Sequence, residues 1–168
     1  MLSIKRGTQG FTLIELLVVI AIIGILASVV LASLNSARVR ARNAGYISQI
    51  KEYQKALELA YNDHGSYPGT IGVWGCIGTG YVNGRCYAGS ATFSETNATA
   101  VDFQTKLDPY IDTSTIPGAL ETVYKGAIYQ PRTNGYSIYY ILTGTDATCP
   151  IGVDYSNYTD MTLCTYTY

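Results

Sequence analysis

One acidic residue, Glu15, stands inside an almost unbroken apolar run near the start of the chain. The run begins after Gly10, and no charged residue occurs at positions 16–34. An ionised carboxylate costs about 2.5–3.5 kcal/mol at the centre of a membrane-spanning helix and less toward its ends. A helix that served only as an anchor would be more stable without this group, so Glu15 is a candidate functional residue.

The length of the run predicts a membrane-spanning helix. The 19 residues at 16–34 would form roughly 28 Å of helix, close to the roughly 30 Å of a bilayer's hydrocarbon core. Lys5 and Arg6 precede the run and predict a cytoplasmic N-terminus. In a secretory signal the cleavage site follows the apolar stretch. Here Gly10 precedes it, so cleavage at that point would leave the helix on the mature protein.

The six residues at 10–15, GFTLIE, resemble the class III signal of type IV pilins and pseudopilins. The resemblance implies that a prepilin peptidase cuts after Gly10 and methylates the new amino terminus at Phe11. Residues 1–10 would then be a leader, 11–34 the membrane-spanning and filament-core half of the N-terminal helix, and 35–168 an extracytoplasmic domain. The alternative is an uncleaved signal anchor in which Gly10 has no role.

The resemblance also implies a role for Glu15 in assembly. The new amine at Phe11 would be a cation in an apolar setting, and Glu15 carries the complementary charge. Pairing between neighbouring subunits would offset both desolvation penalties and set the axial register of a filament. Pairing within one chain is an alternative that the sequence leaves open.

Composition favours one extracytoplasmic domain beyond the membrane helix. The 168 residues leave room for a domain of about 100 residues. The formal charge is −1 and becomes −3 when Lys5 and Arg6 leave with the leader, which argues against nucleic acid as the main ligand. Glycine and tyrosine are abundant, at 17 and 16 residues, a profile typical of β-rich domains.

The helical pattern continues beyond the apolar run to about Asn62. Gly65 and Pro68 then supply a stop signal. Apolar residues at helical spacing predict a face that packs on a sheet. These are Ile47, Ile50, Leu57 and Tyr61, flanked by Tyr46, Tyr53 and Ala60.

The helix departs from the family pattern in one respect and carries a basic cluster after its apolar run. Many family members carry a proline near the position of Ala32, so here any local unwinding would depend on Gly24, Ser28 and Ser33. Just beyond the apolar run lies a basic cluster, which consists of Arg38, Arg40 and Arg42. This cluster would contact lipid headgroups and acidic neighbours, or it would form a solvated helix face.

The remaining residues predict an α+β fold, in which the long helix packs against an antiparallel sheet of three or four strands. An Asn-Gly pair at 83–84 predicts a hairpin, and 100–111 predict a short helix with Val101, Leu107 and Ile111 facing inward. Strands are predicted at 122–130, 135–143 and 161–168. The core candidates in these strands are Ile128, Ile138, Tyr140 and Leu142.

Four cysteines lie in the predicted external domain, namely Cys76, Cys86, Cys149 and Cys164. Their even number and their loop-like surroundings favour disulfides. Three pairings can be drawn, and Cys76–Cys86 with Cys149–Cys164 is favoured because each pair closes a plausible loop. The second pair also resembles the C-terminal disulfide-bounded loop of many type IV pilins. The rival is a zinc site with four cysteines, but no two of them have the Cys-x₂-Cys spacing.

The sequence predicts neither an enzyme nor a cofactor or metal site. Its single histidine, His64, lies at a predicted helix end, and no Ser-His-Asp set or phosphate-cradling glycine motif is present. Nine of the 16 tyrosines occur at 124–168. They could form a glycan-binding surface or an aromatic relay, but half-buried packing in strands explains them better.

The resemblance implies a structural subunit of a type IV pilus-like filament, with a role in adhesion, motility or DNA uptake. The subunit would cross the inner membrane once before assembly and would lie in a cell-surface filament afterwards. Its partners would be other pilin subunits, the prepilin peptidase, the inner-membrane assembly platform and the lipid bilayer. One alternative is a pseudopilin of a type II secretion-like or competence machine. The second is a signal-anchored binding or adhesin domain that never polymerises.

Overall fold

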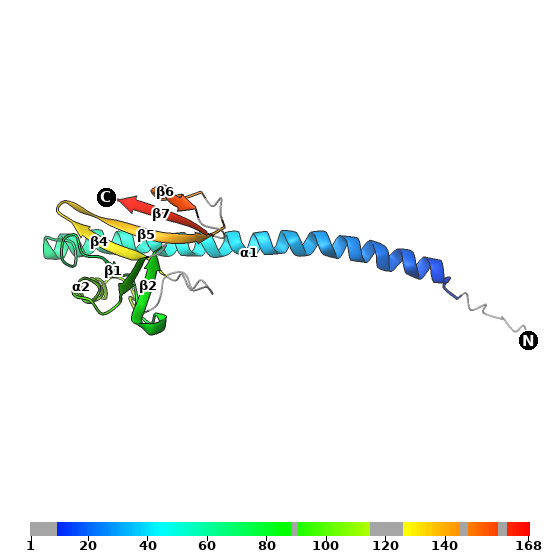
Figure 1. Cartoon of the computed structure of the whole chain (residues 1–168), viewed down its shortest axis with the longest axis horizontal. Coiled ribbons are helices and arrows are strands. Elements are labelled where there is room, and N and C mark those ends of the chain that lie inside the picture. The colour runs from blue at the N-terminus through cyan, green and yellow to red at the C-terminus, as the bar shows by residue number, and fades with distance from the viewer. Residues whose placement is uncertain (1–9, 89–90, 115–125, 145–147, 158–160) are drawn as a thin grey trace, which may run out of the picture. The chain divides into compact units, whose positions relative to one another are not determined.

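The computed structural model describes residues 10–88, 91–114, 126–144, 148–157 and 161–168. The chain divides into two compact units, Met1–Arg38 and Val39–Tyr168. One helix, α1 (Leu13–His64), contains residues of both (Figure 1). The two units are described separately below.

Helix α1 begins and ends close to the predicted positions 11 and 62. At its C-terminal end Gly65 has a φ of +69°, and its N–H donates to the carbonyl of Tyr61 at 2.8 Å. A left-handed residue directly after the last turn is a common way to end a helix, and glycine adopts it without a Cβ clash. The predicted stop signal is therefore confirmed.

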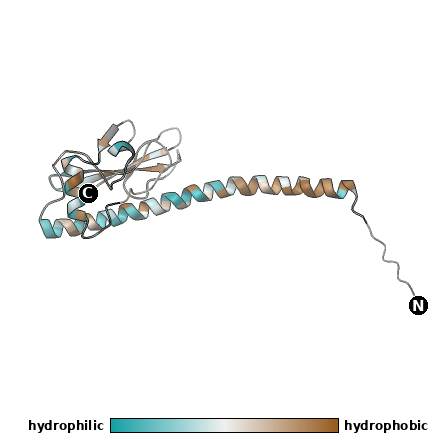
Figure 2. Ribbon diagram, turned by 90° about the horizontal axis from the view of Figure 1, so that it is seen from below, coloured by the Kyte–Doolittle hydropathy of each residue, from teal (hydrophilic) through white to brown (hydrophobic). Residues whose placement is uncertain are grey.

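The two parts of α1 differ in character, as the hydropathy colouring in Figure 2 shows. Within the second unit, α1 buries an apolar stripe that begins at Tyr46. The residues predicted to flank the stripe are buried members of it, while Ile47 is only partly buried and Tyr61 is 43% exposed. The buried members of the stripe are Tyr46, Ile50, Tyr53, Ala56, Leu57 and Ala60.

The main sheet is antiparallel and has the strand order β1-β4-β5-β7-β6. The strands are β1 (Gly75–Cys76), β4 (Ile128–Arg132), β5 (Gly135–Thr143), β6 (Val153–Asn157) and β7 (Met161–Thr167). The predicted α+β class is confirmed, and the four longer strands match the upper end of the predicted number. Strands β1 and β6 have no counterpart among the sequence predictions.

Strands β4 and β5 form a tight hairpin around residues 133–134, in which Arg132 pairs with Gly135. Strand β5 has the predicted bounds, whereas β4 begins at Ile128, later than the predicted start at 122. Gly126 has a φ of +95°, which interrupts the extended backbone directly before this strand. The rest of the early part of that prediction, 122–125, lies outside the described residues.

A second, two-stranded sheet pairs β2 (Arg85–Ala88) with β3 (Ala91–Ser94). The Asn-Gly pair was expected to be the hairpin loop, and this expectation is wrong. Asn83 and Gly84 both have positive φ, but they belong to a 3-10 turn that leads into β2. Strand β2 begins after this turn and pairs with β3, so the Asn-Gly pair lies before the hairpin and not at its loop. The N–H of Tyr81, before the turn, donates to a carboxylate oxygen of Glu95 at 2.9 Å.

A short helix, α2 (Ala98–Leu107), lies where one was predicted but begins two residues earlier. Leu107 is buried and Ile111 is partly buried, as expected, whereas Val101 is 48% exposed. Asn97 caps this helix by accepting the N–H of Ala100 at 2.8 Å. The start set by this cap places Thr99, Ala100, Phe103 and Leu107 on the inner face.

Tyrosines supply much of the core between α1 and the sheet. Tyr129, Tyr136 and Tyr140 are fully buried, as are the predicted core residues Ile138 and Leu142. The Tyr129 hydroxyl donates to the carbonyl of Pro68 at 3.0 Å, which satisfies its polar end inside the core. The packing interpretation is therefore confirmed for these three tyrosines, whereas Tyr168 is 59% exposed and Tyr124 and Tyr158 lie outside the described residues.

Candidate functional site

The predicted processing site lies at the start of the described chain. Phe11 is 85% exposed, and a Cβ added at Gly10 would meet no other atom within 4 Å. Neither residue is part of α1, which begins at Leu13. The peptide bond after Gly10 is thus outside the helix, in an uncovered segment of the described chain, where proteolysis is favoured.

Glu15 caps the N-terminus of α1. One of its carboxylate oxygens accepts the backbone N–H and the side-chain hydroxyl of Thr12, each at 2.8 Å. The Thr12 hydroxyl oxygen in turn accepts the backbone N–H of Glu15 at 3.3 Å. This reciprocal arrangement is a capping box, which satisfies N–H groups that have no partner within the helix.

The sequence analysis did not identify Thr12 as a functional candidate. The signal that could have found it is the spacing Thr-x-x-Glu ahead of an apolar run. The capping box gives Thr12 a direct part in holding the carboxylate of Glu15. Any partner that binds Glu15 must share this carboxylate with Thr12 or displace it.

The apolar residues of the first unit are uncovered on every side of the helix. The large apolar residues from Leu13 to Leu34 have exposed fractions from 44% to 74%. By length and composition, α1 is the one helix of the described chain that could cross a membrane. Uncovered apolar area of this extent requires lipid or another protein surface around it.

The helix is continuous through the glycine at which unwinding was expected. Gly24 lies within α1, and a Cβ there would meet no atom outside the helix within 4 Å. The hydroxyl of Ser28 donates to the carbonyl of Ile25 at 2.7 Å, a back-bond that competes with the helical ladder. Local unwinding at Gly24, Ser28 and Ser33 stays a prediction.

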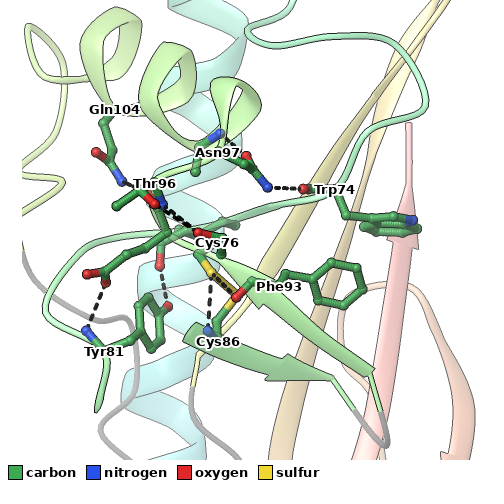
Figure 3. Close-up of a disulfide and its surroundings, with 12 residues drawn as sticks. Trp74, Cys76, Tyr81, Cys86, Phe93, Thr96, Asn97 and Gln104 are labelled. Atoms are coloured by element: carbon green, nitrogen blue, oxygen red, sulfur yellow. Dashed lines mark hydrogen bonds between the residues drawn. A yellow bond between two sulfur atoms is a disulfide. The ribbon is translucent and has the colours of Figure 1, made fainter. Parts of the chain in front are cut away.

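Both disulfides lie in the second unit. Cys76 in β1 is bonded to Cys86 in β2, with 5.7 Å between their Cα atoms. Figure 3 shows this bond beside Phe93 and Trp74, whose rings lie 5.9 Å apart. The bond ties the two sheets together next to the cap of α2, where the Asn97 amide donates to the carbonyl of Trp74 at 2.7 Å.

The second disulfide joins Cys149 to Cys164, with 5.6 Å between their Cα atoms. It connects the segment before β6 to the middle of β7, so it encloses the β6–β7 pair at one edge of the sheet. Cys164 is fully buried and Cys149 is 8% exposed. With all four cysteines in disulfides, no cysteine thiolate is left to bind zinc.

The other predicted residues are dispersed. His64 is the last residue of α1 and is exposed, and the basic cluster of Arg38, Arg40 and Arg42 is exposed along the same helix. Among the residues that the structure describes, no group of three metal-ligating side chains occurs. The candidate site is therefore the segment from Gly10 to Leu34, with Glu15 as its one ionisable side chain.

Comparison with known proteins bears on this same segment. Residues 5–31 match the family model described as the prokaryotic N-terminal methylation motif. The type IV wide pilus major component PilA4 of Thermus thermophilus is 45% identical over 62 residues, which are 37% of this chain and 47% of that protein. The type II secretion system core protein G of Aeromonas hydrophila is 41% identical over 66 residues, 39% of this chain and 46% of that protein.

A third relative matches the chain over more residues. The fimbrial protein EcpC of Eikenella corrodens is 34% identical over 98 residues, 58% of this chain and 62% of that protein. The matches to the first two relatives span about half the length of those proteins. No solved structure matches the chain significantly. The methylation motif and the pilin and pseudopilin relatives support the type IV pilin and pseudopilin family for this chain, a family of structural proteins.

Proposed function

We propose that the chain is a subunit of a type IV pilus-like filament at the cell surface. A peptidase removes residues 1–10, the new amino terminus at Phe11 is methylated, and residues 11–34 hold the subunit in the inner membrane until it polymerises. In the filament this segment leaves the lipid and packs against the same segment of neighbouring subunits. The roles that fit such a subunit are adhesion, motility or DNA uptake.

The observation that carries the proposal is the uncovered apolar helix with a single acid near its start. The residues of α1 up to Leu34 expose apolar side chains on all faces, as expected for a segment surrounded first by lipid and then by equivalent helices. A purely lipid-facing anchor gains nothing from Glu15, whereas a filament core needs a cationic partner for it. The amine of Phe11 in a neighbouring subunit would supply that charge.

The second candidate is a pseudopilin of a type II secretion-like machine. It is supported by the match to type II secretion system core protein G, which covers about the same share of the chain as the match to the major pilus component, 39% against 37%. Two disulfides and the tyrosine-rich second unit favour the surface pilin, because an exposed filament needs a domain that withstands the extracellular medium.

Two measurements test the proposal. Mass spectrometry of the protein purified from membranes should give a chain that begins at Phe11 and carries one added methyl group. An intact Met1 would contradict processing and favour a signal-anchored domain. Filaments sheared from cells should contain the chain. If they lack it while deletion impairs secretion or DNA uptake, the pseudopilin function is correct.

A further inference from the structure

A groove of about 350 Å³ lies in the second unit, between one side of α1 and the end of the sheet. Three tyrosines form its sheet side, namely Tyr136, Tyr166 and Tyr168. Lys51 and Lys55 line it from α1. We call this feature the tyrosine groove.

The aromatic side of the groove is held in place by its own contacts. The rings of Tyr136 and Tyr168 are stacked, with an interplanar angle of 10° and 5.6 Å between centroids. The backbone N–H of Tyr168 donates to the carbonyl of Tyr136 at 2.9 Å, so the ring of Tyr168 is carried by an ordered backbone. Tyr168 nevertheless remains 59% exposed, and a ligand can therefore reach its ring.

The polar side of the groove combines two kinds of group. Lys51 and Lys55 are four residues apart on α1 and are exposed, so their ammonium groups belong to one helix face. Glu58 lines the same groove, and its carboxylate accepts the hydroxyl of Tyr67 at 3.1 Å. Burial and this carboxylate raise the pKa of the Tyr67 phenol, which keeps it protonated as a donor that orients Glu58.

Gln54 adds one more polar group to the groove. Its Nε2 is buried and has no hydrogen-bond acceptor among the residues that the structure describes. A buried donor without an acceptor is costly. A rotation of the amide toward an oxygen atom of a ligand would remove that cost.

We propose that the tyrosine groove binds an acidic sugar residue of a glycan. The apolar face of a pyranose ring packs on the exposed ring of Tyr168, its carboxylate pairs with Lys51 and Lys55, and its hydroxyl groups donate to Glu58. This assignment gives a role to the exposed aromatic ring, the two ammonium groups and the carboxylate of the groove. It does not depend on filament assembly. A polyphosphate chain fits less well, because the carboxylate of Glu58 repels its charge without gaining a hydrogen bond.

Isothermal titration of the full-length chain in detergent micelles tests this assignment. The probe is an oligomer of galacturonic acid, and the matched ligand is the same oligomer with its carboxylates methyl-esterified. We expect saturable binding of the acid and at least about tenfold weaker binding of the ester, since charge-assisted hydrogen bonds are lost. Absence of saturable binding of the acid would overturn the proposal.

Variants locate the binding in the groove. Lys51→Gln combined with Lys55→Gln, and separately Tyr168→Ala, should each weaken binding at least about tenfold, whereas Tyr168→Phe should retain it because the ring is kept. Lys106→Gln is the matched control, since Lys106 lies on α2 and pairs with Asp102 at 2.9 Å. An equal loss in the control, or undiminished binding by Tyr168→Ala, would refute the site.

Two further ligands decide between a sugar site and general attraction of anions. Single-stranded oligothymidylate and an oligoglutamate peptide of the same charge should bind at least about tenfold more weakly than the acidic sugar oligomer. If either binds as tightly, the groove is not a glycan site. Circular dichroism of each variant should match the unaltered chain, because Lys51, Lys55 and Tyr168 are exposed and Lys106 is only partly buried.

Discussion

The side chain of Asn43 in α1 exchanges two hydrogen bonds with the backbone of Thr143, the last residue of β5. Its Nδ2 donates to the Thr143 carbonyl at 2.9 Å, and its Oδ1 accepts the Thr143 N–H at 3.0 Å. The amide thus takes the place of a neighbouring strand at the end of β5. These hydrogen bonds join the sheet to the helix through two residues that are 100 positions apart in the chain.

This pair gives a prediction about stability. Asn43→Ala leaves both backbone groups of Thr143 without this partner, so we expect a loss of about 1–3 kcal/mol in the free energy of unfolding. Urea unfolding followed by circular dichroism measures it. Asn62→Ala is the control, because Asn62 is exposed and its loss should change stability by no more than about 0.5 kcal/mol. Equal stability of the two variants would show that the Asn43 bonds contribute nothing.

Substitution of Glu15 separates processing from assembly. Glu15→Ala removes the carboxylate that caps α1, and it also removes the proposed partner of the Phe11 amine. We expect cleavage after Gly10 to continue largely unchanged, while the yield of sheared filaments falls sharply. Immunoblots of membrane and sheared fractions measure both. Normal filament yield from this variant would argue strongly against an assembly role.

Thr12 gives a sharper test of how the capping box contributes. Thr12→Ser keeps the hydroxyl that bonds to Glu15 and should leave filament yield unchanged. Thr12→Val keeps the shape of the side chain but removes the hydroxyl, and loss of a helix cap typically costs about 0.5–2 kcal/mol. We expect a lower filament yield from Thr12→Val than from Thr12→Ser. Equal yields would mean that the hydroxyl has no part in positioning Glu15.

Removal of the Cys149–Cys164 disulfide should destabilise the second unit. The bond closes a sequence separation of 15 residues, and a loop of this length corresponds to about 3 kcal/mol in the chain-entropy model. We expect the Cys149→Ser, Cys164→Ser double variant to unfold at lower urea concentration with intact membrane insertion. The matched control is the Cys76→Ser, Cys86→Ser variant, whose shorter separation of 10 residues should give a slightly smaller loss.

The buried tyrosines predict unfolding in alkali. Burial raises the pKa of Tyr46, Tyr53, Tyr129 and Tyr136 above the usual value. Above about pH 10 these phenols ionise in the unfolded chain but stay protonated in the folded one. The unfolded state then binds fewer protons, so the free energy of unfolding falls as the pH rises.

This pH dependence can be measured by tyrosinate absorbance and circular dichroism in parallel. Exposed tyrosines should titrate while the fold persists, and the buried ones should ionise together with loss of ellipticity. Tyr129→Phe removes one buried phenol and should reduce the steepness of the fall above about pH 10. Ionisation of all tyrosines in one step with no loss of structure would contradict the prediction.

The sequence alone predicted the long helix, its stop at Gly65, strand β5 and the apolar segment with its acid. These features depend on local patterns: an uncharged run, a helical apolar stripe, and a glycine with positive φ. The capping box of Thr12 and Glu15 is equally local, since the two residues are three apart, and the spacing Thr-x-x-Glu is sufficient to predict it.

Only the tertiary structure decided which surfaces meet. The Asn-Gly pair at 83–84 has the expected positive φ, yet it is not the hairpin loop, because β2 begins after it and pairs with the following strand β3. Likewise Val101 was predicted to face inward but is 48% exposed, whereas Ala100 and Phe103 are buried. The partner of Asn43, Thr143, lies 100 positions away in the chain, and a single sequence contains no periodic pattern that identifies so distant a partner.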